Sequence, residues 1–258
     1  MTQLATVITG ASSGIGEELA KQLAAQEKQA MVLVARRKEK LQELAQQLAS
    51  EHGIRVEVVG LDLEKPGSSQ QLLDAVAGLG LEIDTLINNA GFGLNDNFAD
   101  MPLDRIQAMM HLNMVSLTEL CHGVLPGMRS RKQGRIMNIA SVAAFQSCPR
   151  FAAYGATKSY VLSLSEAMAS EEKANGIKVI AVCPGATATA FHDVAGNNGT
   201  FATKMMDSAE TVARTAIRSM NCGCPLVVTG AMHKPLPFIN RLLPRSVVVW
   251  AAGKVAAR

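Results

Sequence analysis

Short runs of β-branched and aliphatic residues alternate along the chain with longer segments in which apolar residues recur every three or four positions. The short runs predict strands at residues 4–8, 31–35, 56–61, 85–88, 135–139, 178–182 and 226–229. The longer segments predict helices at residues 14–26, 69–79, 103–130 and 153–172, and on the stripe Leu41, Leu44 and Leu48. Strands and helices that alternate in this way are typical of βαβ units, which build parallel sheets.

The alternation predicts an α/β fold, a Rossmann-type doubly wound parallel sheet of about seven strands with helices on both faces. The chain has 258 residues, of which 48% are hydrophobic and 18% charged, so it can bury one large core. Because no Pro- or Ser-rich linker interrupts the pattern, we expect a single domain over residues 1–258. Residues 186–206 are rich in small and polar side chains and are expected to form a long connection.

Composition and charge narrow the classes of function. The formal net charge is only +3, and the basic residues are scattered apart from residues 36–38 and 129–132, so nucleic-acid binding is not expected. The N-terminus leads into a strand-like run without the features of a signal peptide, which predicts a cytoplasmic protein. The five cysteines, including Cys222 and Cys224, match no disulfide framework and no paired metal-ligand spacing, so no metal is expected.

A glycine-rich loop follows the first predicted strand, where residues 9–16 read TGASSGIG. Glycines at such a strand-to-helix turn let the backbone approach a pyrophosphate, whose charge the helix N-terminus stabilises. The loop predicts a dinucleotide site that includes Gly10, Ser12, Ser13, Gly14, Ile15 and Gly16. Its spacing is TGxxxGxG and not GxGxxG, so an ordinary strand-to-helix turn is the alternative on this motif alone.

The cofactor preference depends on Arg36 and Arg37, which follow the second predicted strand. An acidic residue here would bind the ribose 2′-hydroxyl of NAD, whereas a guanidinium can pair bidentately with a 2′-phosphate. We therefore expect NADP(H) to be preferred over NAD(H). The alternative is that both arginines are solvated residues at the start of a helix, although positive charge there opposes the helix dipole.

Further cofactor contacts are expected where the third and fourth predicted strands end. Asp62 and its neighbour Leu63 lie at a position suited to the adenine edge. After the fourth strand, small residues let the cofactor lie against the strand ends, and we expect contacts from Asn89, Ala90 and Gly91. For the preceding Asn88, a structural amide that ties neighbouring strands together is an equally good interpretation.

Tyr154 and Lys158 are four residues apart in a predicted helix, so their side chains lie on one face and the ammonium can approach the phenolate. A positive charge near the phenolate lowers the pKa of a tyrosine. That suits a general acid that protonates a carbonyl oxygen while a nicotinamide delivers hydride to the carbon. Ser141 follows the strand at residues 135–139 and could hydrogen-bond the same oxygen. A tyrosine and a lysine at this spacing are usually ordinary surface residues. Their occurrence together with Ser141 and the glycine loop favours a catalytic role.

These residues together resemble the short-chain dehydrogenase/reductase family over residues 4–190. The resemblance implies that Asn113 holds a water that links Lys158 to solvent as a proton relay, although the sequence alone indicates only a buried polar residue of a helix. It also implies that Pro184, Gly185 and Thr189, with Thr187 in the same motif, hold the nicotinamide carboxamide.

The resemblance further implies a homodimer or homotetramer. One position departs from a common pattern, because many NADP-using relatives carry a basic residue where this chain has Ser13. Arg36 and Arg37 instead match the other common NADP pattern of the family.

The substrate wall is expected in the segments that surround the nicotinamide tip, with contributions from Val142, Phe145, Phe151, Phe191, His192 and Phe201. The phenylalanines predict an apolar pocket for a hydrophobic ketone or aldehyde, with ordinary core packing as the alternative. For His192 a surface loop histidine is the preferred interpretation.

The tail at residues 234–258 contains an apolar run at 247–252 that is too short to span a bilayer. With basic residues around it, the tail could lie on a membrane surface as an amphipathic helix. The account that we prefer is a helix packed on another subunit or over the mouth of the active site.

The sequence thus predicts an NADP(H)-dependent oxidoreductase that acts on a small-molecule carbonyl compound or secondary alcohol. The alternative class is a cofactor-binding regulatory protein that keeps the fold without turnover. The presence of Asn113, Ser141, Tyr154 and Lys158 favours the enzyme, because a sensor would need the nucleotide loop but not the proton relay.

Overall fold

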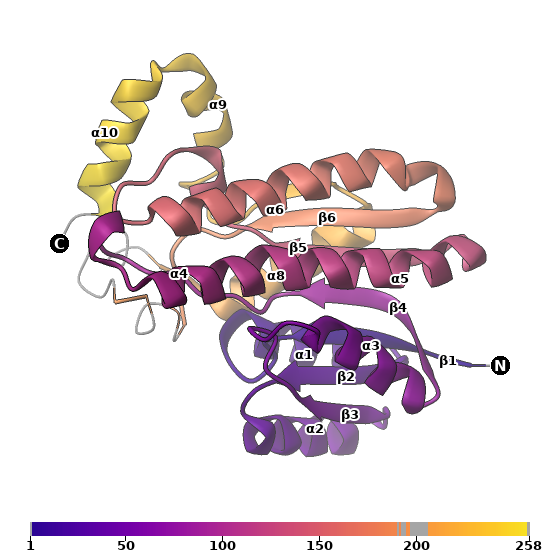
Figure 1. Cartoon of the computed structure of the whole chain (residues 1–258). Coiled ribbons are helices and arrows are strands. Elements are labelled where there is room, and N and C mark those ends of the chain that lie inside the picture. Colours follow the sequence, from indigo (N-terminus) through magenta and orange to yellow (C-terminus); the bar gives the residue numbers. More distant parts are fainter. Residues whose placement is uncertain (1, 190, 192–194, 197–205, 257–258) are drawn as a thin grey trace.

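The computed structural model describes residues 2–189, 191, 195–196 and 206–256, and it confirms the predicted α/β fold. Parallel strands form one central sheet in the order β3-β2-β1-β4-β5-β6-β9 (Figure 1). These strands are β1 (Gln3–Thr9), β2 (Ala30–Ala35), β3 (Val56–Gly60), β4 (Leu81–Asn88), β5 (Gly134–Ile139), β6 (Ile177–Cys183) and β9 (Leu226–Val228). The strand order reverses between β1 and β4, and ligands of such sheets bind beyond the carboxyl ends of the strands at that point.

Helices cover both faces of the sheet. The longer ones are α1 (Gly14–Gln26), α2 (Lys38–His52), α3 (Ser68–Gly78), α4 (Leu103–Met110), α5 (Leu117–Arg131), α6 (Ala152–Glu171) and α8 (Ala209–Cys222). Short 3-10 turns lie at η1 (Phe98–Asp100), η3 (Val142–Phe145) and η4 (Lys173–Asn175). Helices α1, α2 and α8 pack on one face, and α3, α5 and α6 pack on the other.

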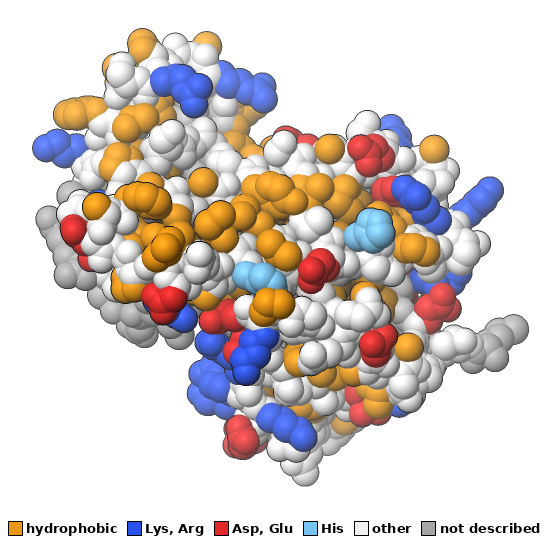
Figure 2. Space-filling view, in the orientation of Figure 1, with side chains coloured by type: hydrophobic (Ala, Val, Ile, Leu, Met, Phe, Trp, Pro, Cys, Tyr) orange, Lys and Arg blue, Asp and Glu red, His pale blue; other side chains and the backbone are white. Residues whose placement is uncertain are grey.

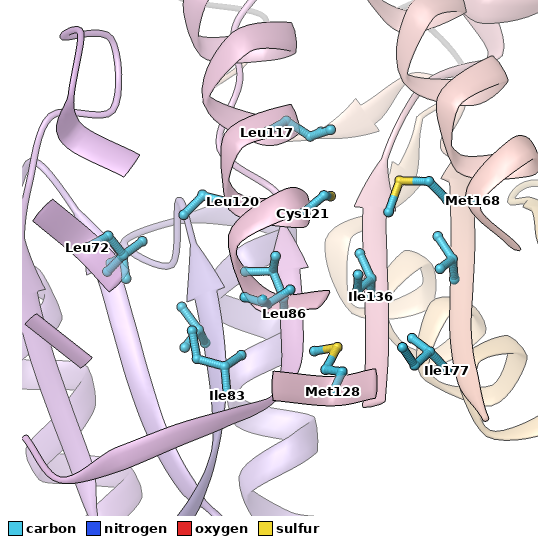
Figure 3. Packing of buried hydrophobic residues seen from close by; sticks show 14 of the residues in the cluster. Leu72, Ile83, Leu86, Leu117, Leu120, Cys121, Met128, Ile136, Met168 and Ile177 are labelled. Carbon is cyan, nitrogen blue, oxygen red and sulfur yellow. The ribbon is translucent and has the colours of Figure 1, made fainter. Parts of the chain in front are cut away.

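The core on the second face is continuous from α3 to α6. Leu72 of α3, Leu120 of α5 and Met168 of α6 pack with Leu86 of β4 and Ile136 of β5 in one buried cluster (Figure 3). Aliphatic side chains on the inner stripe of each helix therefore fix the height of the helices above the sheet, which in turn fixes the loops at the strand ends.

The helix predicted at residues 103–130 is interrupted by a π-helical turn. The turn η2 (His111–Ser116) separates α4 from α5 and contains the buried Asn113. A π-turn holds one extra residue per turn, and such turns are frequent at functional sites. The interruption rotates Asn113 relative to the regular helix that we expected.

Two further elements differ from the sequence prediction. Strand β4 begins at Leu81, four residues before the predicted start, and helix α8 was not predicted at all. The side chain of Ser208 caps α8 by accepting a hydrogen bond from the Thr211 amide, and its buried face includes Val212 and Ile217. The capping serine and the helical spacing of apolar residues are both visible in the sequence. They come directly after residues 186–206, which we expected to form a connection, and α8 was not predicted for that reason.

The connection expected at residues 186–206 lies partly outside the described residues, as do His192 and Phe201. Its described ends, β7 (Thr187–Ala188) and β8 (Asp207–Ser208), form a short parallel pair. The loop therefore leaves and returns at the same place, beside the end of β6.

The C-terminal residues form a helical hairpin of α9 (Leu236–Leu242) and α10 (Arg245–Ala256), which stands beside the N-terminal end of α6 and projects from the body (Figure 1). The side chain of Asn240 anchors α9, because its amide donates to Gln146 Oε1 at 2.7 Å and to the Phe145 carbonyl oxygen at 3.4 Å. Within the described part of the chain, no helix has the length and apolar character needed to cross a membrane.

Candidate active site

A cavity of about 1280 Å³ opens at the carboxyl ends of the parallel strands, and its lining continues onto the C-terminal hairpin. The structure brings most of the sequence-predicted site residues to this one cavity. They are Gly10, Ser12, Ser13, Gly14, Ile15, Arg36, Arg37, Asp62, Leu63, Asn89, Ala90, Gly91, Ser141, Val142, Phe151, Tyr154, Lys158, Pro184, Gly185, Thr187, Thr189 and Phe191. Of the predicted site residues that the structure describes, Gly16, Asn113 and Phe145 lie outside the lining.

The glycine loop turns tightly from β1 into α1. Gly10 and Gly14 have φ angles of +67° and +60°, in the left-handed region that favours glycine. A Cβ on Gly14 would lie only 2.9 Å from Cγ2 of Thr189, so the loop also approaches the segment after β6 closely. The side chain of Ser13, the N-cap of α1, makes no capping hydrogen bond.

Gly16 serves packing and does not contact the cavity, which corrects our expectation of a cofactor contact. A Cβ on Gly16 would collide with the carbonyl oxygen of Gly10 and with the side-chain nitrogen of Asn89. That nitrogen already donates to the carbonyl oxygens of Thr9 and Gly10, at 2.9 and 3.2 Å. Gly16 therefore lets the first turn of α1 lie against the loop.

Gly16→Ala is expected to lower the free energy of unfolding by about 1–3 kcal/mol, the usual cost of forcing an extra methyl group into a packed site. Gly78→Ala is the matched control, because a Cβ on Gly78 at the end of α3 meets nothing within 4 Å. Urea denaturation of both variants measures the effect. An unchanged midpoint for Gly16→Ala would contradict the packing role.

Arg36 and Arg37 lie at the end of the cavity beyond β2. The Nη2 atom of Arg37 donates to the hydroxyl oxygens of Ser13 and Ser12, at 2.8 and 3.0 Å, so this guanidinium contacts the glycine loop. The Nη1 atom of Arg36 lies 2.7 Å from a carboxylate oxygen of Glu64. Both residues are exposed, and both line the cavity at its rim.

The residues after β3 and β4 divide into lining and structural groups. Asp62 accepts a hydrogen bond from the Glu64 amide at 3.1 Å and faces the cavity. The side-chain amide of Asn88 donates to Asn138 Oδ1 at 2.9 Å, so it ties β4 to β5. The Asn89 side chain ties the end of β4 to the glycine loop, which leaves Ala90 and Gly91 as the small residues on that wall.

Ser141, Tyr154 and Lys158 meet at the inner wall of the cavity. Ser141 follows β5 and begins η3, where its Oγ accepts a hydrogen bond from the Ala143 amide at 3.1 Å. Lys158 lies one turn after Tyr154 on α6, and its Nζ donates to the Ile139 carbonyl oxygen at 2.7 Å. This Nζ lies 5.8 Å from the centre of the Tyr154 ring.

Burial controls both titrating groups. Burial raises the pKa of Tyr154 above its ordinary value of 10, and a side-chain hydrogen bond with Ser141 opposes the rise. Burial also lowers the pKa of Lys158 from 10.5 to about 8. Desolvation therefore outweighs the effect of the Lys158 ammonium, which is bound to the Ile139 carbonyl, so the pKa of Tyr154 is not lowered overall as we expected. At neutral pH the phenol is protonated and the ammonium is charged.

Asn113 acts from behind this wall. Its Oδ1 accepts from the Phe92 amide at 3.2 Å, and its Nδ2 donates to the Phe92 carbonyl oxygen and to Thr157 Oγ1, at 3.0 and 3.1 Å. The side chain thereby joins the loop after β4 to α6, next to Tyr154. Its side-chain groups are engaged in these contacts, and the relay water implied by the resemblance stays a prediction.

Aromatic rings surround Tyr154. The ring centroids of Phe151 and Phe191 lie 5.7 and 5.4 Å from that of Tyr154, and both residues line the cavity as expected. Phe145 does not, which corrects our expectation. It packs against the core cluster under η3, because the tight 3-10 turn places Val142 toward the cavity and Phe145 toward the sheet.

The sequence analysis expected the tail on another subunit or over the mouth of the active site, but it named none of the residues that close the outer end of the cavity. The described lining continues through Met232, His233, Leu236, Ile239, Asn240, Leu243, Val248, Ala251, Ala252 and Val255. The hairpin thus lies over the mouth of the cavity. The spacing of Val248, Ala252 and Val255 on one helical face was the available signal, but it did not show which surface that face would cover.

Comparison with known proteins agrees with the fold and the cavity. The family model described as short chain dehydrogenase matches residues 4–198. The chain is 32% identical over 249 residues to a very-long-chain 3-oxoacyl-CoA reductase of Anas platyrhynchos, covering 94% of this chain and 77% of that protein.

Two solved structures are also similar. A short-chain dehydrogenase from Sphingobium yanoikuyae in complex with NADPH has a TM-score of 0.82 and 31% identity, covering 92% of this chain and 93% of that one. A bulky-bulky ketone specific alcohol dehydrogenase from Comamonas testosteroni has a TM-score of 0.77 and 28% identity, covering 93% of this chain and 92% of that one.

The fold and the cavity define a nicotinamide-dependent oxidoreductase of the α/β class. The chain belongs to the short-chain dehydrogenase/reductase family. It is accordingly an enzyme that acts on CH–OH and C=O groups with NAD(P) as acceptor or donor.

Proposed function

We propose that the protein reduces hydrophobic ketones or aldehydes with NADPH, and that Tyr154 delivers the proton to the carbonyl oxygen. The observation that carries this proposal is the arrangement of one cavity, with Ser141, Tyr154 and Lys158 at its inner wall and two guanidinium groups at its rim. The relatives support it, since one is named a 3-oxoacyl-CoA reductase and another binds NADPH.

The residues of the cavity fit the cofactor. Gly10 and Gly14, with positive φ angles that other residues rarely adopt, allow the tight turn that leads to the start of α1, where the helix N-terminus can stabilise a pyrophosphate. Arg36 and Arg37 offer charged donors for a 2′-phosphate. NADPH, when held by these residues, would supply the hydride for the carbonyl carbon. Pro184 and Thr189, which the family resemblance implies for the carboxamide, line the same cavity as Tyr154 and would hold the nicotinamide.

The proton steps belong to the side chains of this chain. The buried Tyr154 hydroxyl is protonated at neutral pH, which suits a general acid in the direction of reduction. The Ser141 hydroxyl can donate to the same carbonyl oxygen and stabilise the negative charge that develops there. The Lys158 ammonium adds positive charge beside the site, and the Ile139 carbonyl fixes its position.

The substrate end of the cavity is apolar. Phe151 and Phe191 flank Tyr154, and Ile239, Leu243 and Val248 approach from the hairpin. Such a wall favours hydrophobic carbonyl compounds, because it offers area for apolar contact. The relative from Comamonas testosteroni, which is specific for bulky ketones, is consistent with a large apolar substrate.

NADPH consumption, followed by absorbance against a panel of aldehydes, bulky ketones, steroids and acyl-chain ketones with NADH in parallel, tests the proposal. We expect turnover with apolar ketones and with NADPH above NADH. Tight NADPH binding without turnover on any member would instead favour a non-catalytic, NADP(H)-binding regulatory protein. The homodimer or homotetramer and the cytoplasmic location stay predictions.

The value of kcat/KM for reduction is expected to fall as the pH rises through about 8. The pKa of Lys158 is lowered to about 8, so its ammonium is present below this pH and is lost above it. Without that charge the neighbouring Tyr154 becomes a weaker acid. Because kcat/KM reports the pKa values of the free enzyme, a profile between pH 6 and 10 measures the effect. A profile that is flat to pH 10 would contradict it.

A further inference from the structure

The C-terminal hairpin differs in charge from the rest of the chain. Residues 231–258 contain five Lys and Arg residues and no Asp or Glu, whereas the preceding 230 residues contain 20 basic and 22 acidic residues. Lys234, Arg241, Arg245 and Lys254 are all exposed. The hairpin is therefore a cationic surface attached to a body whose formal charge is slightly negative.

The same hairpin exposes large apolar side chains. Leu242 is 84% exposed, Phe238 68% and Trp250 66%. Val247 is less exposed but lies one helical turn before Trp250 on α10. Monomeric proteins rarely leave so many large apolar side chains together in water, and such groups mark interaction surfaces.

Three of the most exposed apolar residues of the hairpin, Phe238, Leu242 and Trp250, lie outside the cavity lining. On α9, Leu236 and Ile239 line the cavity, whereas Phe238 and Leu242 do not. On α10, the lining residue Val248 is buried and Trp250 is exposed. Orange apolar and blue basic side chains accordingly appear together on the lobe formed by the projecting hairpin (Figure 2). We call the surface formed by Phe238, Leu242, Trp250 and the nearby cations the outer face.

We propose that the outer face binds the surface of an anionic lipid bilayer. Bilayer-surface helices combine Trp, Phe and Leu on one side with Lys and Arg near the lipid headgroups. The cations are attracted by anionic headgroups, and the apolar side chains then enter the boundary with the acyl chains. Since the hairpin is too short and too polar to cross the bilayer, the attachment is peripheral.

Charge decides between a bilayer and a second copy of the chain. In a two-fold contact the same surface of each subunit faces its partner. The outer face would then bring together the four described Lys and Arg residues of each tail, eight in all, without an acidic residue from either tail. Like charges across an interface are costly, whereas an anionic bilayer complements them.

Sedimentation of the full-length protein with vesicles tests the proposal. The vesicles are phosphatidylcholine alone, or phosphatidylcholine with about 30 mol% phosphatidylglycerol. We expect partitioning at least about tenfold stronger on the anionic vesicles at 0.1 M salt than on the neutral ones, with most of the difference lost at about 0.5 M salt.

Two variants remove the two contributions separately. L242S/W250S removes apolar contact, and R241Q/R245Q/K254Q removes three charges. Each should reduce binding to anionic vesicles about tenfold or more. The matched controls are L103S/V115S, two exposed apolar residues of α4 and η2, and K40Q/K65Q/K173Q, three exposed lysines far along the chain from the hairpin. Both controls should bind as the unmodified protein does.

Thermal unfolding and NADPH binding check that each variant is folded, and neither depends on lipid. Absence of binding to anionic vesicles by the unmodified protein would overturn the proposal, as would equal binding by the outer-face variants and their controls. A lipid-free dimer in analytical ultracentrifugation that L242S/W250S dissociates would also overturn it, in favour of a second copy. The vesicle experiment needs no turnover, so its outcome is independent of the proposed reductase activity.

Discussion

Tyr154→Phe is expected to lower kcat/KM for carbonyl reduction by about 10²–10⁴-fold, the usual contribution of a positioned general acid. The variant keeps the aromatic ring between Phe151 and Phe191 and loses only the hydroxyl. The fold and the cavity should therefore persist. Steady-state kinetics with the best ketone from the substrate panel, at saturating NADPH, measures the effect.

The chain offers a matched control, because its other tyrosine is Tyr160 on the same helix. The Tyr160 hydroxyl lies 2.9 Å from Thr118 Oγ1 and its side chain does not line the cavity, so Tyr160→Phe should leave the kinetics unchanged. NADPH affinity should be similar in both variants. Equal activities of Tyr154→Phe and Tyr160→Phe would remove Tyr154 from the proton transfer.

Arg36→Ala/Arg37→Ala is expected to weaken NADPH binding by about 10–100-fold and to leave NADH binding nearly unchanged. A hydrogen bond to a charged group contributes about 1.5–3 kcal/mol, and only NADPH carries the 2′-phosphate that these guanidinium groups can bind. Fluorescence titration with each reduced cofactor gives the two dissociation constants.

The single variants separate the two arginines. Arg37 also holds Ser12 and Ser13, so Arg37→Ala should weaken both cofactors slightly, whereas Arg36→Ala should act on NADPH alone. Lys40→Ala is the control, since Lys40 is an exposed cation of α2 that does not line the cavity. A loss of the same size for NADH and NADPH in the double variant would refute the assignment to the 2′-phosphate.

The sequence was sufficient to predict the sheet and the inner end of the cavity. Parallel strands end at one edge of the sheet, so residues that follow predicted strands, such as Gly10, Asn89 and Ser141, had to gather there. The spacing of Tyr154 and Lys158 likewise fixed their common face on α6. These predictions needed only the spacing of apolar residues in each helix or strand and the fact that parallel strands run in the same direction.

Other features depend on contacts that no local pattern encodes. The π-turn around Asn113 contains no Gly or Pro that would mark a break, so the sequence indicated one continuous helix. The pKa of Tyr154 is raised because the fold removes it from water, which its spacing from Lys158 does not reveal. Phe145 turns toward the core because of the geometry of η3. The sequence left two placements open for the tail, another subunit or the mouth of the active site, because only long-range packing decides between them.

The hairpin has a consequence for how substrate range can change during evolution. It follows the last strand of the sheet, so insertions and substitutions there do not alter the register of any strand. Under the proposed function, selection can reshape the part of the wall built by Ile239, Leu243 and Val248 while the proton-transferring residues on α6 stay in place. Substrate specificity can then change without a change in the proton-transfer chemistry. A chimera in which the C-terminal segment of a relative replaces that of this chain should acquire the substrate preference of the relative and keep the pH profile of this protein.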